Sequence, residues 1–331
     1  MRAARHFVYG SPAEVLRVVD VPPEEPAADE VIVRMEAAAL HLADLRALSG
    51  LPGFQYPLPR TPGFEGIGHV ARVGRAVTTW RVGDRVFPPL GSGTCRDEVR
   101  CKAAQCLPAP PGDAVQLSLV VVNGATAQVL LDDFGDLRTG DWFIQNAANS
   151  SCGRYLIRLA ARKGVRSVNI VRRPELLDEL RELGGDVVLE DGADLAARVA
   201  HAVHGAPIKV AFDAVGGAAT QRLAECLTPG STVVSYGAMS GQPCHLDFYL
   251  MFRNDIRLQG VSFVRQLQRR SADQVRQMYA RLAELVATGE LVARVAGVYE
   301  LEDIVTAFER AAQTGADRDG KVIVRLRSST R

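Results

Sequence analysis

The 331-residue sequence lacks several features that would assign it to a class at once. No apolar run reaches the roughly 18 residues that a membrane span requires. The N-terminal segment resembles a first strand and has neither the apolar stretch nor the cleavage site of a signal peptide. The net charge is only +1, which gives no argument for a nucleic acid or a membrane as partner. A cytoplasmic enzyme or binding protein is therefore expected.

Cysteine is too sparse and too widely spaced to organise a metal centre. None of the six cysteines forms a C-x-x-C pair: Cys95, Cys101, Cys106, Cys152, Cys226 and Cys244. A structural zinc site generally takes four closely spaced ligands, and the first three cysteines have no fourth ligand nearby. Reduced, partly buried thiols are therefore expected.

The sequence changes its pattern near Leu117. Before this point, short runs rich in valine and glycine alternate with turn signals, which predicts a small barrel-like β domain over residues 1–117. After it, six strand-like runs alternate with helical patterns and predict a doubly wound parallel sheet over residues 118–265. The last of these strands is expected at residues 256–263. The fold class is thus α/β with two domains.

The remaining residues, 266–331, do not continue the repeat of the sheet. They begin with a long amphipathic helix, roughly residues 272–288, and close with the strand-like run GKVIVRL. A lone strand that follows a completed sheet needs a partner elsewhere. We therefore expect this segment to return to the first domain.

The turn QNAANSSCG, residues 145–153, follows the first predicted strand of the parallel sheet. A dinucleotide-binding turn typically reads G-x-G-x-x-G, and only Gly153 remains of its three glycines. Asn149, Ser150 and Ser151 stand directly before a helix and can offer hydrogen bonds to a phosphate group. An ordinary N-capped helix fits the same residues, so the turn alone leaves both interpretations open.

The end of the second predicted strand favours one cofactor. An NAD site places an acidic residue about 20 residues after the turn, whereas an NADP site places arginine there. The sequence has Arg172 and Arg173 at this point and no acid before Glu175. Guanidinium groups bind phosphate bidentately, so the pair favours the 2′-phosphate of NADPH. The alternative, two solvated arginines at a helix start, would place positive charge where a helix disfavours it.

Several segments, in this order, carry a family resemblance: DEVIVRMEAAALHLADLRALSG, PGFEGIGHVARVG, WRVGDRVF, QNAANSSCG, NIVRRPE, FDAVGG, VVSYGAMSGQP and GKVIVRL. The chain resembles the medium-chain dehydrogenase/reductase superfamily, and most closely its zinc-free 2-enoyl thioester reductase and quinone oxidoreductase branches. This resemblance implies a GroES-like β-barrel catalytic domain and a Rossmann dinucleotide-binding domain. The cofactor-binding residues that it implies are Asn149, Ser150, Ser151, Cys152, Gly153, Arg172, Arg173, Tyr236, Gly237, Met239, Phe263 and Lys321.

The resemblance also implies that no metal is used. The zinc-dependent branch has a cysteine at the position of His41, a histidine at that of Phe64, and a further cysteine or aspartate near Ala125. Only His41 and Glu65 remain here as possible ligands. Catalytic zinc normally takes three protein ligands and keeps one open position. Zinc-dependent alcohol oxidation is therefore not expected.

A metal-free reduction of an activated C=C bond needs hydrogen-bond donors at the carbonyl oxygen and a proton for the α-carbon. Enoyl reductases carry a tyrosine in the loop before the G-x-E segment, but counting back from Gly63 places Pro52 there. Tyr56 lies four residues further on and is one candidate catalytic residue; its alternative is a surface tyrosine. His41 is the other candidate, because a near-neutral pKa would suit proton transfer. Its alternative is a hydrogen-bonded, partly buried histidine.

The sequence thus predicts an NADPH-dependent reductase that acts on a small-molecule substrate, with a 2-enoyl thioester of CoA or a carrier protein as first choice. A quinone or enone oxidoreductase is the alternative within the superfamily, and a non-catalytic nucleotide-binding protein is the alternative from another class. The resemblance further implies a homodimer in which the run IRLQGVSF pairs across a two-fold axis.

Overall fold

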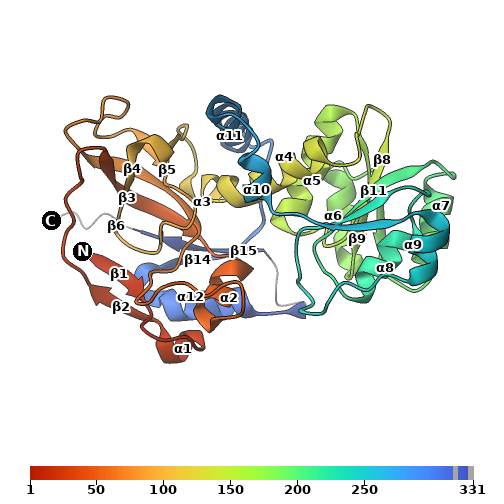
Figure 1. Cartoon of the computed structure of the whole chain (residues 1–331), viewed down its shortest axis with the longest axis horizontal. Helices are drawn as coiled ribbons and strands as arrows, with labels where there is room; N and C mark the ends of the chain where they lie inside the picture. The colour runs from red at the N-terminus through yellow and green to blue at the C-terminus, as the bar shows by residue number, and fades with distance from the viewer. Residues whose placement is uncertain (316–319, 327–331) are drawn as a thin grey trace. The chain divides into compact units, whose positions relative to one another are not determined.

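Two units make up the protein, whose computed structural model describes residues 1–315 and 320–326 (Figure 1). Unit 1 comprises Met1–Val122 and Arg276–Arg331, and unit 2 comprises Asn123–Val275. The expected boundaries, after residues 117 and 265, each lie a few residues earlier. No helix in the described ranges is long and apolar enough to cross a bilayer.

Unit 1 is built on a mainly antiparallel sheet of seven strands. Its order is β14-β15-β3-β4-β5-β7, and β6 also pairs with β3. The strands are β3 (Glu30–Ala39), β4 (Glu65–Val73), β5 (Arg85–Phe87), β6 (Glu98–Lys102), β7 (Leu107–Pro108), β14 (Val295–Glu300) and β15 (Lys321–Arg325). A two-stranded sheet, β1 (Arg2–Arg5) with β2 (Arg17–Asp20), stands beside it. The helices are α1 (Pro12–Val15), α2 (Leu42–Ser49), α3 (Ala114–Leu117), α11 (Ala272–Ala287) and α12 (Ile304–Ala312).

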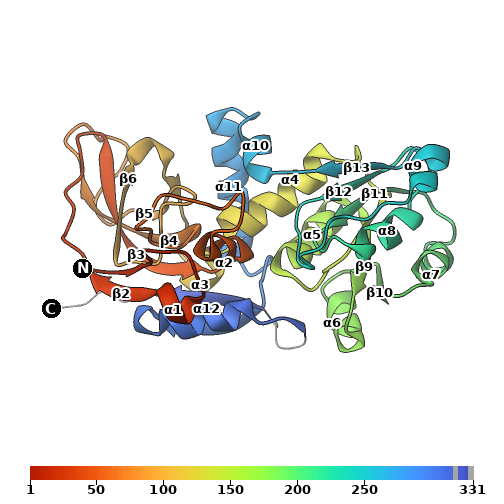
Figure 2. The same cartoon turned by 60° about the horizontal axis from the view of Figure 1, so that its bottom comes forward.

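The closing strand returns to the first domain, as predicted. β15 pairs antiparallel with β3 through Ile323 opposite Ala39, and parallel with β14 on its other side. Its apolar residues Val322 and Val324 are buried in the core of unit 1 together with Ile304 and Phe308 of α12. α12 lies against β14 and β15 in Figures 1 and 2. The packing of α12 therefore helps to hold the final strand between β14 and β3.

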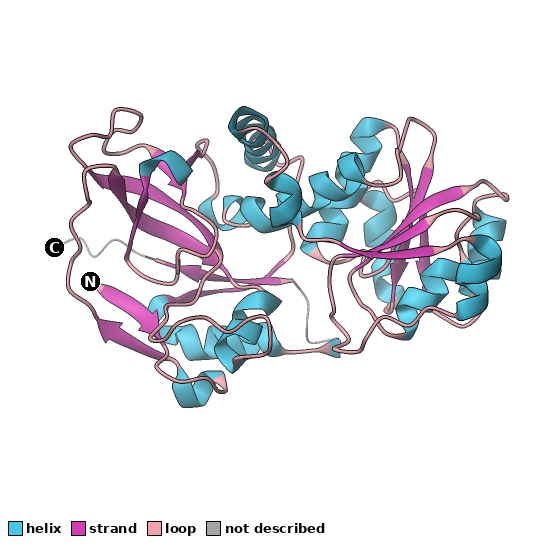
Figure 3. Cartoon of the chain, viewed as in Figure 1, coloured by secondary structure: helices cyan, strands magenta, loops and turns pink. Residues whose placement is uncertain are grey.

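Unit 2 is a doubly wound parallel sheet, and Figure 3 shows helices on both of its faces. Its order is β10-β9-β8-β11-β12-β13, with every neighbouring pair parallel. The strands are β8 (Trp142–Gln145), β9 (Arg166–Val171), β10 (Val187–Glu190), β11 (Ile208–Asp213), β12 (Thr232–Ser235) and β13 (Arg257–Gly260). The helices are α4 (Ala125–Asp133), α5 (Ser151–Lys163), α6 (Leu177–Glu182), α7 (Leu195–Ala202), α8 (Ala218–Glu225), α9 (Phe248–Asn254) and α10 (Phe263–Leu267).

The edge strand differs from the sequence prediction. The run 256–263 was expected to be one apolar strand, but β13 ends at Gly260 and Phe263 already begins α10. All four residues of β13 are exposed, and the strand lies at the edge of the sheet. Of this run, Ile256 is buried in the core of unit 2, and it lies just before β13.

Candidate functional site

A buried polar chain lies in unit 1 where β3 leads into α2. His41 caps the start of α2, and its own backbone N–H donates to Oδ2 of Asp44 at 2.9 Å. The other oxygen of Asp44 accepts the N–H of Gly63 at 2.9 Å. Asp44 therefore ties the turn at His41 to the segment that leads into β4, whose first residue is Glu65. These two hydrogen bonds of Asp44 bring the imidazole of His41 close to the carboxyl group of Glu65.

The side chains of this chain connect Lys321, His41 and Glu65. Nζ of Lys321 lies 2.8 Å from Nδ1 of His41. Nε2 of His41 lies 2.5 Å from Oε1 of Glu65, and Oε2 of Glu65 accepts the N–H of Val122 at 2.7 Å. The neighbouring carbonyl of Val121 accepts the hydroxyl of buried Tyr279 at 3.0 Å. The carboxylate is thus anchored by backbone that a buried tyrosine holds in place.

Donor and acceptor roles determine the protonation of this chain. A lysine ammonium can only donate, so Nδ1 of His41 must accept and the imidazole proton must be on Nε2. Nε2–H then donates to Glu65, whose second oxygen already accepts a backbone N–H. Burial raises the pKa of Glu65, while the Val122 N–H and the Lys321 ammonium oppose that rise. The chain therefore places a neutral imidazole between an ammonium and a buried carboxyl group whose pKa is raised to about 8.

The expected near-neutral pKa of His41 is wrong. Burial, aided by the nearby Lys321 ammonium and opposed by Asp44, lowers the pKa of His41 to about 3. Both ring nitrogens are also engaged, one by the Lys321 ammonium and the other by Glu65. His41 consequently stays neutral at physiological pH, and it orients its two neighbours rather than titrating.

Tyr56 lies in the loop before β4, outside the buried chain. Its ring is half-buried, with the Arg60 guanidinium 3.8 Å from the ring centroid and Phe64 edge-on at 6.1 Å. Its carbonyl accepts the hydroxyl of Tyr9 at 2.6 Å. The arginine–aromatic contact alone would account for a tyrosine at this position. The loop therefore holds the ring firmly without showing what its hydroxyl does.

In unit 2, the predicted cofactor residues lie at the carboxyl edge of the parallel sheet. Asn149 to Gly153 follow β8, Arg172 and Arg173 follow β9, and the group around Gly237 follows β12. Because the carboxyl ends of parallel strands meet at the same edge, these segments share one end of the sheet. Open α/β sheets bind their ligands at that end.

The glycine-poor turn is a capped helix start with one indispensable glycine. The Ser150 hydroxyl accepts the N–H of Gly153 at 3.1 Å and caps α5. A Cβ on Gly153 would lie 2.6 Å from the carbonyl oxygen of Ala148, so no other residue fits without a shift. Ser151 and Cys152 are buried in the first turn. The first turn of α5 thus keeps its close approach to the strand end with this glycine alone.

A buried hydroxyl lies beside this helix start. The hydroxyl of Tyr236, which follows β12, interacts with Cys152 and Ser150, but neither contact has regular hydrogen-bond geometry. Burial raises the pKa of Tyr236, so the group stays a protonated donor. Buried polar groups are rarely left unpaired in folded proteins. A bound polar ligand at this edge is one way to satisfy it.

The two arginines after β9 have different surroundings. Arg172 is exposed, and no ion pair of Arg172 is found within the described chain. Arg173 is more buried, and its Nε lies 3.8 Å from a carboxylate oxygen of Glu175. Arg172 is therefore the better placed of the two to bind an added phosphate.

A buried network that the sequence did not reveal holds this edge together. Asp213, at the end of β11, accepts hydrogen bonds from Asn146 Nδ2 at 2.6 Å and from Thr220 Oγ1 at 2.6 Å. It also accepts the backbone N–H groups of Val215 and Gly216 at 2.9 and 3.0 Å. A carboxylate that follows a predicted strand was the available signal, but its partner Asn146 lies 67 residues away in the sequence.

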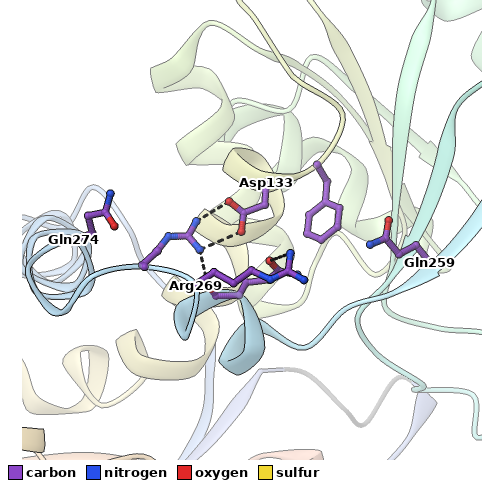
Figure 4. Close-up of a pocket in the computed structure, with 7 residues that line it drawn as sticks. Asp133, Gln259, Arg269 and Gln274 are labelled. Atoms are coloured by element: carbon purple, nitrogen blue, oxygen red, sulfur yellow. Dashed lines mark hydrogen bonds and ion pairs between the residues drawn. The ribbon is translucent and has the colours of Figure 1, made fainter.

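Two hollows of unit 2 lie away from this edge. One, of about 510 Å³, lies between the end of α4, β13 and α10 (Figure 4). There the Arg270 guanidinium binds both oxygens of Asp133, at 2.7 and 3.1 Å, so its charge is already matched. The other, of about 490 Å³, lies at the amino ends of β11 and β12. Neither is the carboxyl-edge site.

Two family profiles match the chain: an alcohol dehydrogenase GroES-like domain over residues 27–133 and a zinc-binding dehydrogenase domain over residues 152–284. The mitochondrial enoyl-[acyl-carrier-protein] reductase of Homo sapiens is 33% identical over 315 residues, which cover 92% of this chain and 84% of that one. The chain belongs to the medium-chain dehydrogenase/reductase superfamily.

Solved structures of the superfamily share the whole fold. A Bacillus thuringiensis protein described as an NADPH:quinone reductase matches with a TM-score of 0.90 and 26% identity, over 98% of each chain. A mycobacterial protein in complex with NADPH matches with a TM-score of 0.85 and 25% identity, over 98% of this chain and 100% of that one. The chain is an oxidoreductase of this superfamily, with a GroES-like unit 1 and a Rossmann-type unit 2.

The residues at the superfamily's zinc position do not fit a zinc ion here. His41 and Glu65 hydrogen-bond directly to each other, and the second imidazole nitrogen accepts from the Lys321 ammonium. A metal cation would have to displace one hydrogen bond and sit beside a positive charge, which Coulomb repulsion opposes. The aromatic side chain of Phe64 supplies no ligand atom. Three protein ligands for a catalytic zinc cannot be assembled from this set.

The remaining predicted cofactor residues are spread over both units. Gly237 packs so closely that a Cβ would lie 2.6 Å from the Ala214 carbonyl oxygen, and Met239 nearby is 37% exposed. Phe263 is the first residue of α10 rather than the end of a strand. Lys321 belongs to unit 1, where it contacts His41, 280 residues away in the sequence. That separation explains why the sequence alone did not pair the two residues.

Proposed function

We propose that the protein is an NADPH-dependent, metal-independent reductase of an activated C=C bond, with a 2-enoyl thioester as substrate and quinone or enone reduction as the alternative. The single observation that carries the metal-independent part is the Lys321–His41–Glu65 chain, which occupies the zinc position with side chains hydrogen-bonded to one another. The enoyl thioester is favoured over the quinone because the human relative is named for that reaction. A non-catalytic role is disfavoured by the cost of burying such a chain without a use.

NADPH is supported by the carboxyl edge of unit 2. There the capped start of α5, the buried Tyr236 hydroxyl and the exposed Arg172 guanidinium would hold the pyrophosphate and the 2′-phosphate. When bound, NADPH supplies the hydride for the β-carbon. The mycobacterial structural relative was solved with this cofactor.

Within unit 1, we propose that Lys321 holds the proton destined for the α-carbon. Its ammonium is half-buried and oriented by Nδ1 of His41. Glu65 accepts the hydrogen bond from the other ring nitrogen and so fixes the orientation of the imidazole. His41 positions the lysine, and solvent restores its proton after transfer. Tyr56 remains the competing donor, since its phenol carries an O–H group.

The function is tested by following NADPH absorbance with crotonyl thioesters, quinones and alkenals, each with and without exhaustive chelation. We expect the fastest consumption with the crotonyl thioester and no loss of rate on chelation. Faster turnover of quinones would shift the assignment to the alternative. Zinc bound at one equivalent, with activity lost on its removal, would contradict metal independence, and no turnover of any acceptor would favour a non-catalytic protein.

Replacing Arg172 by alanine is expected to lower NADPH affinity at least tenfold and leave NADH affinity unchanged, because a charged phosphate contact of about 1.4 kcal/mol is lost. Arg173→Ala is the matched control, and we expect a smaller effect because Glu175 already faces this guanidinium. Fluorescence titration of both cofactors measures the change. Equal affinities of the unaltered protein for NADPH and NADH would refute the preference.

We propose a homodimer that forms across β13. The strand is fully exposed at the sheet edge, and the preceding helix α9 exposes Phe248, Tyr249 and Phe252 at 61, 62 and 73%. Exposed edges and aromatic patches of this kind are generally covered. Light scattering is expected to give twice the chain mass, and Phe252→Glu to weaken the dimer at least tenfold. A monomer mass for the unaltered protein at micromolar concentration would exclude the assembly.

A further inference from the structure

Two buried thiols of unit 1 lie in contact with each other. The sulfur of Cys101, in β6, is 3.4 Å from the sulfur of Cys106, which follows the short 3₁₀ turn Ala103–Gln105. Both side chains are almost fully buried, at 8 and 3% exposure. The proposed reduction uses neither of them. A polar contact between two thiols in an apolar core needs an explanation of its own.

The backbone around the pair is held in place on both sides. Cys101 lies opposite Val31 in the β6–β3 ladder. The carbonyl of Ala103, within the turn, accepts the indole N–H of Trp80 at 2.8 Å, and the Ala103 N–H donates to Asp29 at 3.1 Å. The two sulfurs are therefore presented to each other by a fixed turn. A disulfide would bring the two sulfurs from 3.4 Å to a bonded distance of about 2.05 Å.

The surroundings favour Cys101 as the nucleophile. The hydrogen bond from Cys106, with help from the nearby Arg96 guanidinium, lowers the pKa of Cys101 against the effect of burial. The same contact raises the pKa of Cys106, which keeps its proton. Thiolate character is what makes a cysteine react with oxidants. Cys95, by contrast, is fully buried and burial raises its pKa, so it is an inert reference thiol in the same unit.

We propose that Cys101 and Cys106 are a redox modification site that small hydroperoxides convert reversibly to a disulfide. The Cys101 thiolate attacks one peroxide oxygen, the O–O bond breaks, and a sulfenic acid forms while the leaving oxygen takes a proton to become water or an alcohol. The Cys106 sulfur then displaces the sulfenic hydroxyl, which leaves as water with the Cys106 proton. The two thiols lose two electrons and two protons, and the peroxide gains them. A dithiol reverses the step by exchange.

This site is independent of the proposed reductase function, and its test uses the full-length protein without substrate. The protein is treated with hydrogen peroxide, the remaining thiols are alkylated, and trypsin cleaves after Lys102, between the two cysteines. Only a disulfide can then keep the peptides on either side of Lys102 together. We expect this cross-linked pair to form at least tenfold faster than Cys226 or Cys244 oxidises, and to disappear with dithiothreitol.

Variants separate the two chemical steps. Cys106→Ser should leave Cys101 as a sulfenic acid that dimedone captures, while Cys95→Ser should form the disulfide at the unaltered rate. Free Cys101 and Cys106 in protein whose Cys226 or Cys244 is already oxidised would overturn the proposal. So would irreversible over-oxidation of Cys101 with Cys106 still reduced. Both outcomes are measured on the unaltered protein, so the test does not depend on whether a variant folds.

Discussion

Lys321→Met is expected to lower kcat for an enoyl thioester by about 10²-fold or more, the usual loss when a positioned proton donor is removed. Lys321→Arg should lose nearly as much, because it keeps the positive charge beside His41 but does not release a proton near neutral pH. A similar loss of kcat in both variants would show that Lys321 acts by proton transfer and not only through its positive charge. Stopped-flow kinetics at saturating NADPH, with cofactor affinity titrated separately, measures the effect.

Tyr56→Phe is the matched control for this prediction, since it removes the competing donor in the loop before β4. We expect its kcat to stay within about threefold of the unaltered enzyme. The pH profile adds a second readout: His41, with a pKa of about 3, should produce no step near its ordinary value of 6.5. A large loss in Tyr56→Phe with full turnover in Lys321→Met would reassign the donor.

Asp213→Ala is expected to reduce the free energy of unfolding by about 3 kcal/mol or more, because it leaves several buried donors without an acceptor. Those donors are the Asn146 amide, the Thr220 hydroxyl and the two backbone N–H groups at the start of the loop after β11. Asp213→Asn should also be costly, since its amide NH₂ would face some of these donors. Urea denaturation followed by circular dichroism gives the value.

Asp178→Ala provides the comparison within the same unit. Asp178 pairs with Arg181 on the surface of α6 and is 87% exposed, so its loss should cost less than about 0.5 kcal/mol. If Asp213→Ala were equally mild, the network would not be what holds β8 and β11 together at their carboxyl ends. NADPH affinity should decrease in Asp213→Ala and stay unchanged in Asp178→Ala.

Strand and helix patterns were readable because they depend on neighbouring residues. The alternation of β8, α5 and β9 follows from local apolar periodicity, and Gly153 identified the helix start. The edge strand was overextended because Val261 and Phe263 continue its apolar pattern, whereas β13 ends at Gly260 and Phe263 begins α10. Periodicity alone cannot tell a short buried helix from a strand.

The site was less readable because its chemistry depends on distant contacts. His41 and Lys321 were both singled out from the sequence, but as a titrating residue and a cofactor ligand. Only the fold shows that they meet, and that burial, aided by the lysine ammonium, keeps the imidazole neutral. The Asn146–Asp213 bond escaped notice for the same reason. The residue types identified candidate catalytic and binding side chains. The pKa of His41 and the hydrogen-bond partners of these side chains could be learned only from the three-dimensional structure.

The central position of β15 has a consequence for biosynthesis. Unit 2 is one continuous stretch, so it can fold while the ribosome is still adding residues, as domains commonly do. Unit 1 must wait, because the strand between β3 and β14 is made among the last residues of the sequence. Lys321 arrives with that strand. A nascent chain can therefore hold a finished dinucleotide fold while it still lacks the ammonium group of the Lys321–His41–Glu65 chain.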